Sequence, residues 1–405
     1  RSPSSSTATS HPAGAQENER ESALVRLLLV RADLLAYYAP LEGVEALFNE
    51  ALAVARQNHQ PLLEAEVVLA LGWQIYQSGR AREAESFLDH ALALAEQNDD
   101  VRLRCRALSF VAALYFQRAE WEQAKATTKA ALALARQQDD LIMAATLLQN
   151  LSVIDSALYH PEAAERHLRE ALAIFQTQRM VHKEANALYL LGGFFDERGQ
   201  YSEAQEIYRR ALELAEATGN KRAAMETLIN IGISLDQMGD YAGALASSQR
   251  ARLAEQEMRN PYARATIFAN LSLHAHHTGD QEQALLYAAE TIRLATELAM
   301  PVMAAYGFEF RGHALLALAD APAAAAAYQE ALQMRENGQQ EAPAAEARAG
   351  LARAALAVGN HVEALVWIEP IVESLQQGTL TDAEEPLRVY WTACQVLRAA
   401  QDPRA

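Results

Sequence analysis

Residues 191–220 read LGGFFDERGQYSEAQEIYRRALELAEATGN, and the small residues of this segment return along the chain at a constant step of 40 residues. A sequence period of this size is typical of a solenoid, in which one structural unit is stacked repeatedly on its neighbours. Three columns of small residues keep the step: Ala84, Ala124, Ala164, Ala204, Ala244, Ala284, Ala324 and Ala364; Gly72, Ala112, Ser152, Gly192, Gly232, Ser272, Gly312 and Ala352; and Ala51, Ala91, Ala131, Ala171, Ala211 and Ala251.

Each unit contains two helices. In residues 61–100, apolar side chains recur at helical spacing first around Leu63 and Val67 and again around Leu88 and Leu92. The small columns indicate where the two helices cross, because helices approach closely only where a side chain is nearly absent. A single pair has too little core to fold alone, so we expect each unit to be stabilised by its neighbours.

Turn and cap residues recur with the same period. Glycine recurs at the end of the first helix, at Gly79, Gly199, Gly239, Gly279 and Gly359. Glycine can adopt the left-handed conformation that ends a helix. Aspartate or asparagine occurs where the next unit begins, at Asp100, Asp140, Asn220 and Asn260. The side-chain oxygen of these residues can accept a hydrogen bond from a free amide at the start of a helix. Pro261 and Pro301 occupy a first helical position, which proline tolerates.

Composition excludes several classes of function. The net charge of -17 and the presence of only four lysines oppose direct nucleic-acid binding, which needs clustered basic residues. No apolar run is long enough to span a membrane, and no signal peptide is recognisable, so we predict a cytoplasmic protein without membrane contact. The two cysteines, Cys105 and Cys394, lie on apolar stripes and are expected to be buried and reduced.

The pattern Leu191-Gly192, Phe195, Gly199, Tyr201, Ala204, Tyr208 and Ala211 resembles the tetratricopeptide repeat. HEAT and armadillo repeats share the longer period, but the small columns fit the tetratricopeptide scheme better. The resemblance implies an all-α fold, a right-handed α-α superhelix of nine helix-turn-helix repeats plus a C-terminal capping helix. We expect a disordered linker over residues 1–20, nine repeats in one solenoid domain over 21–380, and the capping helix over 381–405, with an apolar stripe of Leu387, Tyr390, Trp391, Cys394 and Leu397.

Repeats of about 40 residues also resemble the helical sensor arms of bacterial STAND and LuxR-type signalling regulators. This resemblance implies that the chain is part of a larger signalling or transcription regulator. Its partner would be a protein, a peptide or a small inducer.

In the tetratricopeptide scheme the first helix of each unit lines a concave groove. The position two residues before the second small column points into that groove and carries Asn150, Asn230 and Asn270. A carboxamide can donate and accept hydrogen bonds with an extended peptide backbone. The alternative is that these asparagines are ordinary solvated side chains.

Aromatic and acidic side chains accompany the asparagines. Tyr189, Trp73, Tyr76, Phe110, Tyr306 and Phe310 are candidates for apolar pockets, although aromatic residues at helical spacing are often core. Asp236 shares its position in the repeat with Asp196 and His276. An acidic strip there would favour a cationic partner, and the alternative is a charged face that only keeps the protein dissolved. We therefore predict Asn150, Tyr189, Asn230, Asp236, Asn270 and His276 as ligand contacts.

Two further patterns predict no site. His274, His276 and His277 are close in sequence and His313 could approach from the next unit, but two ligands at helical spacing do not make a metal site, so a solvated polar patch is favoured. The lysine-rich clamp by which some family members hold terminal carboxylates is missing, because none of the four lysines falls on a groove position.

No catalytic or nucleotide-binding motif is recognisable, so we predict no enzyme activity and no cofactor. The leading hypothesis is an interaction or sensor module that binds its ligand in the groove. The competing hypothesis is a self-associating scaffold or spacer without a specific groove ligand.

Overall fold

The structure, a computed structural model, describes residues 12–36, 41–338, 340–377 and 386–404. Among these residues it contains nineteen helices and no strand. The predicted all-α fold, built from helix-turn-helix repeats with one further helix at the C-terminal end, is confirmed. Most helices are 17 residues long and their starts follow the 40-residue step.

The chain divides into two compact units, Arg1–Met180 and Val181–Ala405, and each is described by itself. The first unit contains α1 (Pro12–Ala36), α2 (Leu41–Gln57), α3 (Pro61–Gln77), α4 (Ala81–Gln97), α5 (Val101–Gln117), α6 (Trp121–Gln137), α7 (Leu141–Ala157) and α8 (Pro161–Thr177). The second contains α9 (Val181–Glu197), α10 (Tyr201–Ala217), α11 (Lys221–Gln237), α12 (Tyr241–Met258), α13 (Pro261–His277), α14 (Gln281–Glu297), α15 (Pro301–Ala317), α16 (Ala321–Asn337), α17 (Glu341–Ala357), α18 (His361–Gln377) and α19 (Pro386–Ala399).

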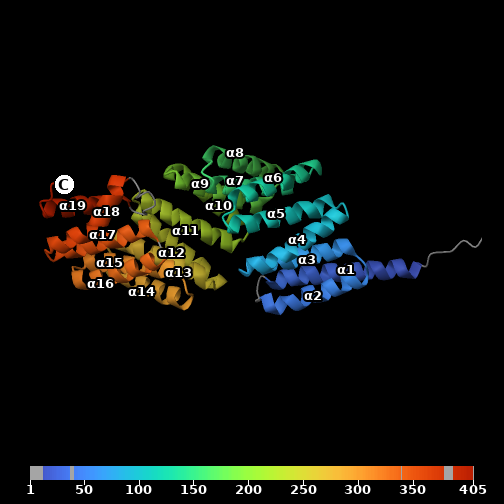
Figure 1. Ribbon diagram of the computed structural model, residues 1–405, viewed down its shortest axis with the longest axis horizontal. Helices are drawn as coiled ribbons and strands as arrows, with labels where there is room; N and C mark the ends of the chain where they lie inside the picture. Colours follow the sequence, from blue (N-terminus) through green and yellow to red (C-terminus); the bar gives the residue numbers. More distant parts are fainter. Residues whose placement is uncertain (1–11, 37–40, 339, 378–385, 405) are drawn as a thin grey trace, which may run out of the picture. The chain divides into compact units, whose positions relative to one another are not determined.

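Consecutive helices pack as pairs in both units (Figure 1). Within a unit, an odd-numbered first helix lies against the second helix that follows it and against the second helix of the preceding repeat. First helices of neighbouring repeats also touch one another, as α11, α13 and α15 do. The first helices of these repeats therefore form one layer, and a ligand site on that layer can draw residues from successive repeats.

The small columns lie at the helix crossings, as predicted. The alanines of the first column, from Ala84 to Ala364, are at most 1% exposed. A Cβ atom on Gly192 would lie 2.5 Å from the Tyr208 ring, and one on Gly312 would lie 2.6 Å from the Tyr328 ring. Glycine is required there because the ring of the second helix fills the space that a side chain would take.

The predicted turns and caps are confirmed. Gly79 and its periodic equivalents have positive φ, and Ala119, Tyr159 and Ala319 adopt the same left-handed conformation in the repeats that lack glycine. Asp100 accepts a hydrogen bond from the amide of Leu103 at 2.8 Å. The second helices α12, α14 and α16 are capped in the same way by residues that were not predicted, Asp240, Asp280 and Asp320.

The N-terminal end departs from expectation. Helix α1 begins at Pro12, so residues 12–20 of the expected linker are helical, and residues 1–11 lie outside the described residues. The physical reason is composition: the segment PAGAQENER combines good helix formers with a proline at the first helical position.

The C-terminal helix buries only part of the predicted apolar stripe: Leu397 is buried and Tyr390 packs against the core. In α19, Leu387 is 80% exposed, Trp391 is 59% exposed and Cys394 is exposed, whereas Val389 and Val396 are buried. Helix α19 packs on both α17 and α18, and these two neighbours together select its buried side. The predicted burial of Cys394 is therefore wrong, while Cys105 is buried.

Within the described part of the chain, no helix is long and apolar enough to cross a membrane.

Candidate functional site

Each unit has a hollow lined mainly by three successive first helices. The N-terminal hollow has a volume of about 330 Å³ and is lined by Trp73, Tyr76, Ser109, Phe110, Ala112, Ala113, Phe116, Thr128, Thr146, Asn150, Val153 and Ile154. The C-terminal hollow has a volume of about 380 Å³ and is lined by Ile233, Asp236, Gln237, Thr266, Ala269, Asn270, Leu273, His274, Met303, Tyr306 and Phe310. Both volumes lie in the range of small-molecule and side-chain pockets.

The two hollows occupy equivalent positions of the repeat. Trp73 and Ile233 stand at the same place in their units, as do Tyr76 and Asp236. On α13 the lining residues include Thr266, which precedes Asn270 by four positions. A spacing of three or four residues brings side chains onto one helix face, so the hollows follow directly from the repeat.

The N-terminal hollow is walled by stacked aromatic rings. The Trp73 ring lies 4.9 Å from the Tyr76 ring and 4.3 Å from the Phe110 ring, measured between centroids. The Tyr76 hydroxyl donates to the carbonyl oxygen of Ala113 at 3.3 Å, and burial raises the pKa of Tyr76. Asn150 adds a carboxamide to an otherwise largely apolar wall. The hollow is suited to an apolar or aromatic group.

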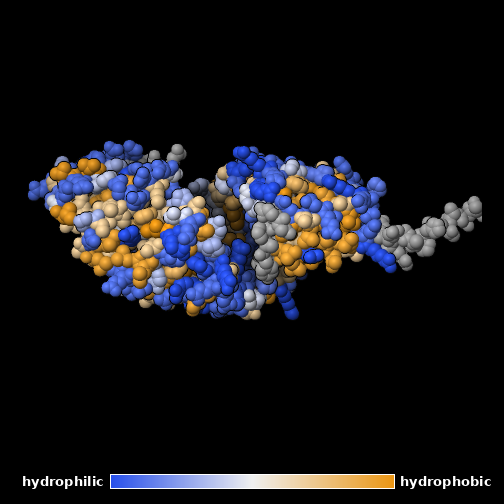
Figure 2. All heavy atoms as spheres, turned by 90° about the horizontal axis from the view of Figure 1, so that it is seen from below, coloured by the Kyte–Doolittle hydropathy of each residue, from blue (hydrophilic) through white to orange (hydrophobic). Residues whose placement is uncertain are grey.

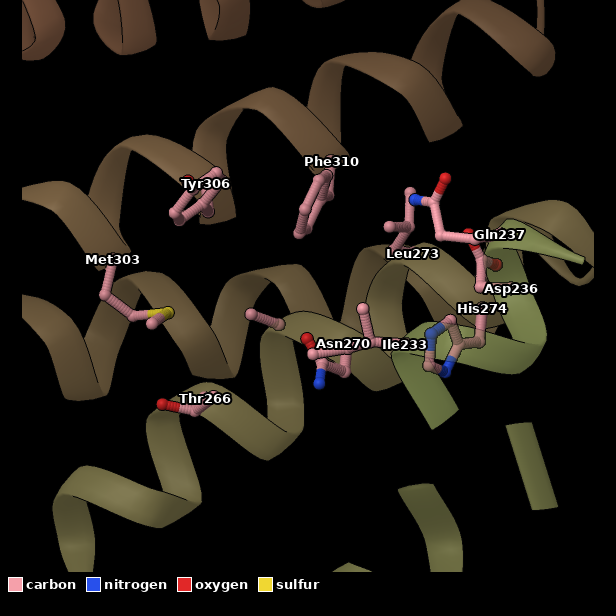
Figure 3. A pocket seen from close by; sticks show the side chains of 11 residues that line it. Ile233, Asp236, Gln237, Thr266, Asn270, Leu273, His274, Met303, Tyr306 and Phe310 are labelled. Carbon is pink, nitrogen blue, oxygen red and sulfur yellow. The ribbon is translucent and has the colours of Figure 1, made fainter. Parts of the chain in front are cut away.

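The C-terminal hollow has one aromatic side and one polar side (Figure 3). The Tyr306 and Phe310 rings are stacked with centroids 5.8 Å apart. Figure 3 shows Asp236 and His274 together at the other end, with Asn270 between the two sides. The Nδ2 atom of Asn270 is buried and has no hydrogen-bond partner among the described residues. A buried donor of this kind is costly to leave unpaired, which favours a ligand that brings an acceptor.

Asp236 is connected to the C-terminal helix. Its Oδ1 atom lies 2.7 Å from Nδ1 of His277, and Nε2 of His277 lies 3.1 Å from Nη2 of Arg388. Because an arginine can only donate, Nε2 of His277 accepts, and its Nδ1–H donates to Asp236. His277 therefore bridges Asp236 of the hollow to Arg388, which lies 111 positions after His277 in the sequence.

The other histidines are buried among protein groups. His274 is 1% exposed and lies 3.1 Å from the Ser248 hydroxyl through Nδ1, and its burial lowers its pKa to about 4. Burial also lowers the pKa of His276 to about 4 and that of His313 well below its usual value. The rings of His276 and His313 are 5.7 Å apart.

The expected solvated histidine patch is therefore wrong, because the helix crossings bury His274 and His313. His313 does approach, as anticipated, but its neighbour is His276. Within the described ranges, no group of three or more histidine, cysteine or carboxylate side chains is arranged to hold a metal ion.

The predicted ligand contacts do not lie together in one site. Asn150 lies in the N-terminal hollow, and Asp236 and Asn270 lie together in the C-terminal one. Asn230 instead donates from Nδ2 to the Tyr208 hydroxyl at 3.4 Å, and the Tyr189 ring lies 6.3 Å from the Tyr208 ring.

His276 is directed to Gln281, whose Oε1 lies 2.8 Å from its Nδ1, and it does not line either hollow. The lining residues of the C-terminal hollow that were not predicted from the sequence include Thr266, Leu273 and Met303. The signal that could have found Thr266 and Leu273 is their spacing from Asn270, four residues before it and three after it, which places all three on one face.

Comparison with known families and structures supports the assignment from sequence. Two tetratricopeptide-repeat models match the chain, one over residues 144–177 and one over residues 183–252. No curated protein sequence matches it.

The solved structures that are similar to most of the chain include the following three. A Rap protein complexed with Competence and Sporulation Factor is 16% identical, with 88% of this chain and 98% of that chain covered and a TM-score of 0.59. Aspartyl phosphate phosphatase F from Bacillus subtilis is 17% identical, with 95% and 97% covered and a TM-score of 0.59. A STAND protein with a tetratricopeptide repeat sensor from Pyrococcus horikoshii is 17% identical, with 91% and 55% covered and a TM-score of 0.61. At these identities the likeness is one of fold.

Proposed function

The chain belongs to the tetratricopeptide-repeat family, and we propose that it is an interaction or sensor module that binds a peptide or a partner protein along its first helices. The observation that carries this proposal is the pair of equivalent hollows, each formed mainly by three successive first helices. Within each unit, a pocket lined by successive first helices suits a side chain of an extended peptide that runs along those helices.

The polar groups of the hollows support the same function. Asn150 and Asn270 stand at the same position of the repeat, and each lies beside aromatic rings. A ligand carbonyl oxygen that accepts from Asn270 Nδ2 would satisfy its buried donor. Aromatic walls supply most of the contact area and the asparagines fix the ligand's register.

Two of the similar structures agree with a sensor role. One is a Rap protein complexed with Competence and Sporulation Factor, and another is a STAND protein in which the tetratricopeptide repeat is the sensor. We propose by analogy that this array is the sensor arm of a larger bacterial signalling or transcription regulator. A variant of this proposal is that a small inducer binds in one hollow, because the volumes of the hollows are large enough for a small molecule.

We propose a non-catalytic role, although the fold also occurs in a phosphatase. The carboxylate and the imidazole that line the C-terminal hollow are held by other groups of the protein: Asp236 by His277, and His274 by Ser248. Neither hollow brings a nucleophile and a general base together at hydrogen-bond distance among its lining residues, which covalent catalysis requires.

The proposal can be tested by selecting peptides from a displayed random library on the intact chain and measuring their affinity by calorimetry. We expect Asn150→Ala or Asn270→Ala to weaken the selected peptides about tenfold, a loss of about 1.4 kcal/mol. Asn230→Ala should have a smaller effect because its carboxamide already contacts Tyr208. The matched control is Asn337→Ala, at an exposed position on the second helix α16.

Unfolding should be measured on the same variants. The proposal requires the melting temperature of the Asn150 and Asn270 variants to stay close to that of the unchanged chain. If the selected peptides bind both variants as tightly as they bind the control, the asparagines and their hollows are not the binding site.

A further inference from the structure

One position of the repeat contributes side chains to both hollows. The residues that line a hollow from this position are all apolar: Trp73, Ala113, Val153, Ile233 and Leu273. They stand at the 40-residue step on successive first helices. The residue type at this position therefore decides what the layer of first helices offers to a ligand in each repeat.

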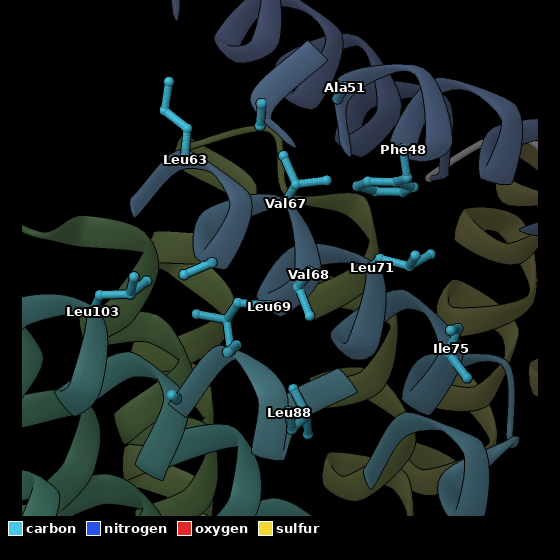
Figure 4. Packing of buried hydrophobic residues seen from close by; sticks show 14 of the residues in the cluster. Phe48, Ala51, Leu63, Val67, Val68, Leu69, Leu71, Ile75, Leu88 and Leu103 are labelled. Atoms are coloured by element: carbon cyan, nitrogen blue, oxygen red, sulfur yellow. The ribbon is translucent and has the colours of Figure 1, made fainter. Parts of the chain in front are cut away.

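This position lies on a side of the first helix that is not used for packing on the second helices. Figure 4 shows the packing sides for α3, where Val67 lies toward Phe48 and Ala51 of α2, and Val68 lies toward Leu88 of α4. A first helix thus buries one side against each neighbouring second helix. The remaining side faces the hollows.

In the two repeats that follow the C-terminal hollow, the same position is basic. It carries His313 on α15 and Arg353 on α17. The ring of Phe310, which lines the hollow, lies 6.1 Å from the ring of His313 between centroids. Nδ1 of His313 lies 2.7 Å from the hydroxyl of Tyr328, and Cζ of Arg353 lies 6.0 Å from the centroid of the Tyr328 ring. A chain of contacts therefore leads from the hollow to Arg353.

A second arginine reaches the same place from α19. Nη2 of Arg388 lies 3.1 Å from Nε2 of His277, and the ring of His276 lies 5.5 Å from that of His277 and 5.7 Å from that of His313. Burial is the main cause that lowers the pKa of His276 to about 4, and the charges of Arg388 and Arg353 lower it further. Both arginines act on His313 in the same way. Since His276 and His313 are neutral at pH 7, the positive charge is supplied by the two arginines.

Arg353 differs from typical arginines of this unit in its surroundings. Figure 2 shows hydrophilic residues scattered among hydrophobic ones on the C-terminal unit, in the left-hand part of the view. Arg210, Arg250 and Arg293 each pair with a glutamate at 3.0 Å or less. Arg353 pairs with no carboxylate among the described residues, and its Nε atom is buried without a hydrogen-bond partner there. A guanidinium among neutral rings favours an anionic ligand, because its charge is not balanced by a neighbour.

Two buried carboxylates of these repeats are occupied by other groups. Asp236 accepts from His277, and Glu309 lies 3.5 Å from Arg335. A ligand that places an anion at Arg353 would therefore complement the site without displacing either pair.

We propose that Arg353 and Arg388 bind a carboxylate of the ligand whose apolar group fills the C-terminal hollow. This inference rests on the proposed function, because it takes the ligand to be a peptide. A guanidinium can donate two parallel hydrogen bonds to one carboxylate. The carboxylate is either the C-terminus of the peptide or an aspartate or glutamate side chain, and the experiment separates these two sources.

The experiment compares two pairs of acetylated probes that differ only in one negative charge. Acetyl-phenylalanine and its amide test a terminal carboxylate, and the amidated dipeptides acetyl-Phe-Asp and acetyl-Phe-Asn test a side-chain carboxylate. The full chain is labelled with 15N-histidine, and the shifts of the His276 and His313 ring signals give the affinity of each probe. We expect the acid of at least one pair to bind about tenfold more tightly than its neutral match.

Arginine variants locate the effect. Arg353→Gln should reduce the preference for the acid to about twofold or less, and Arg388→Gln should reduce it as well. The matched control is Arg398→Gln, because Arg398 is exposed on the same helix as Arg388 and should leave the preference unchanged. Melting temperatures of all three variants show whether they remain folded.

The proposal is overturned if neither acid binds more tightly than its neutral match, or if the preference persists in both the Arg353→Gln and Arg388→Gln variants. Equal binding of acids and amides that Asn270→Ala weakens would leave the hollow as a binding site and remove only the anion site. If the acids bind as expected but no peptide is selected from the displayed library, the anion site stands and the peptide-binding function fails.

Discussion

The N-terminal and C-terminal hollows are built on equivalent positions of one repeat, but their chemistry differs. Where the first has Trp73, Tyr76 and Phe110, the second has Ile233, Asp236 and Asn270 at the same places in the unit. The first hollow is dominated by stacked rings, and the second combines two rings with a carboxylate, a carboxamide and an imidazole.

The difference shows how a repeat protein separates architecture from recognition. The small residues determine where the helices cross. The crossings in turn set which positions of the first helices line the hollows. The side chains at those positions differ between the two hollows, while the small residues at the crossings keep the same period. Four predictions compare equivalent positions of the two hollows or test the polar groups of the second.

The largest expected difference concerns the aromatic wall. Trp73→Ala removes a ring stacked on two others and should lower the free energy of unfolding by about 3 kcal/mol. The equivalent Ile233→Ala should lower it by about 1 kcal/mol, because Ile233 is 38% exposed. Urea unfolding followed by circular dichroism measures both. Equal losses would mean that the stack adds nothing to stability.

The second prediction concerns pH. Burial lowers the pKa of His274 to about 4 in the folded chain, while an unfolded histidine titrates at about 6.5. Between these values the unfolded state binds more protons, so the free energy of unfolding falls as pH is lowered, by up to about 1.4 kcal/mol per pH unit. Above that window the contribution does not change with pH.

His274→Leu, which installs the residue type of the equivalent Leu114, should remove about 1.5 kcal/mol of the stability loss between about pH 6.5 and pH 5. Urea titrations at several pH values give the slope. The exposed His361→Leu serves as control and should keep the original slope. An unchanged slope in the His274 variant would show that other groups carry the pH dependence.

The third comparison concerns one hydrogen bond in each hollow. Asp236→Asn weakens the bond from His277 to a charged acceptor and should lower the free energy of unfolding by about 1–2 kcal/mol. The equivalent Tyr76→Phe removes a longer bond to Ala113 and should cost about 0.5 kcal/mol. Thermal unfolding of both variants tests this order. If the Asp236→Asn variant were more stable than the unchanged chain, the cost of burying the carboxylate would exceed the gain from His277.

The smallest expected change is for Asn270→Ala. Its Nδ2 atom has no partner among the described residues, so the lost packing is offset by removal of an unpaired buried donor. We expect the free energy of unfolding to change by less than about 0.5 kcal/mol, measured by urea unfolding without ligand. A loss above about 1 kcal/mol would assign Asn270 a structural role and weaken the contrast with the aromatic hollow.

Part of the lining of the two hollows was accessible from sequence. The asparagine column led to Asn150 and Asn270, and both line hollows. Asn230 of the same column does not line either hollow, because the large Tyr208 packed against Gly192 brings its hydroxyl to that carboxamide. Periodicity treats the three asparagines alike, whereas the size of the neighbouring side chain distinguishes them.

The sequence by itself determined the helix pairs, their ends and the crossing points, because these depend on contacts within a repeat or between neighbours and recur every 40 residues. Tertiary structure alone decided which side chains share a hollow, that Arg388 reaches His277, and which faces of α1 and α19 stay uncovered by the described residues. These features depend on how helices pack across repeats and at the ends of the stack, where the neighbour that would continue the period is different or missing from the described residues.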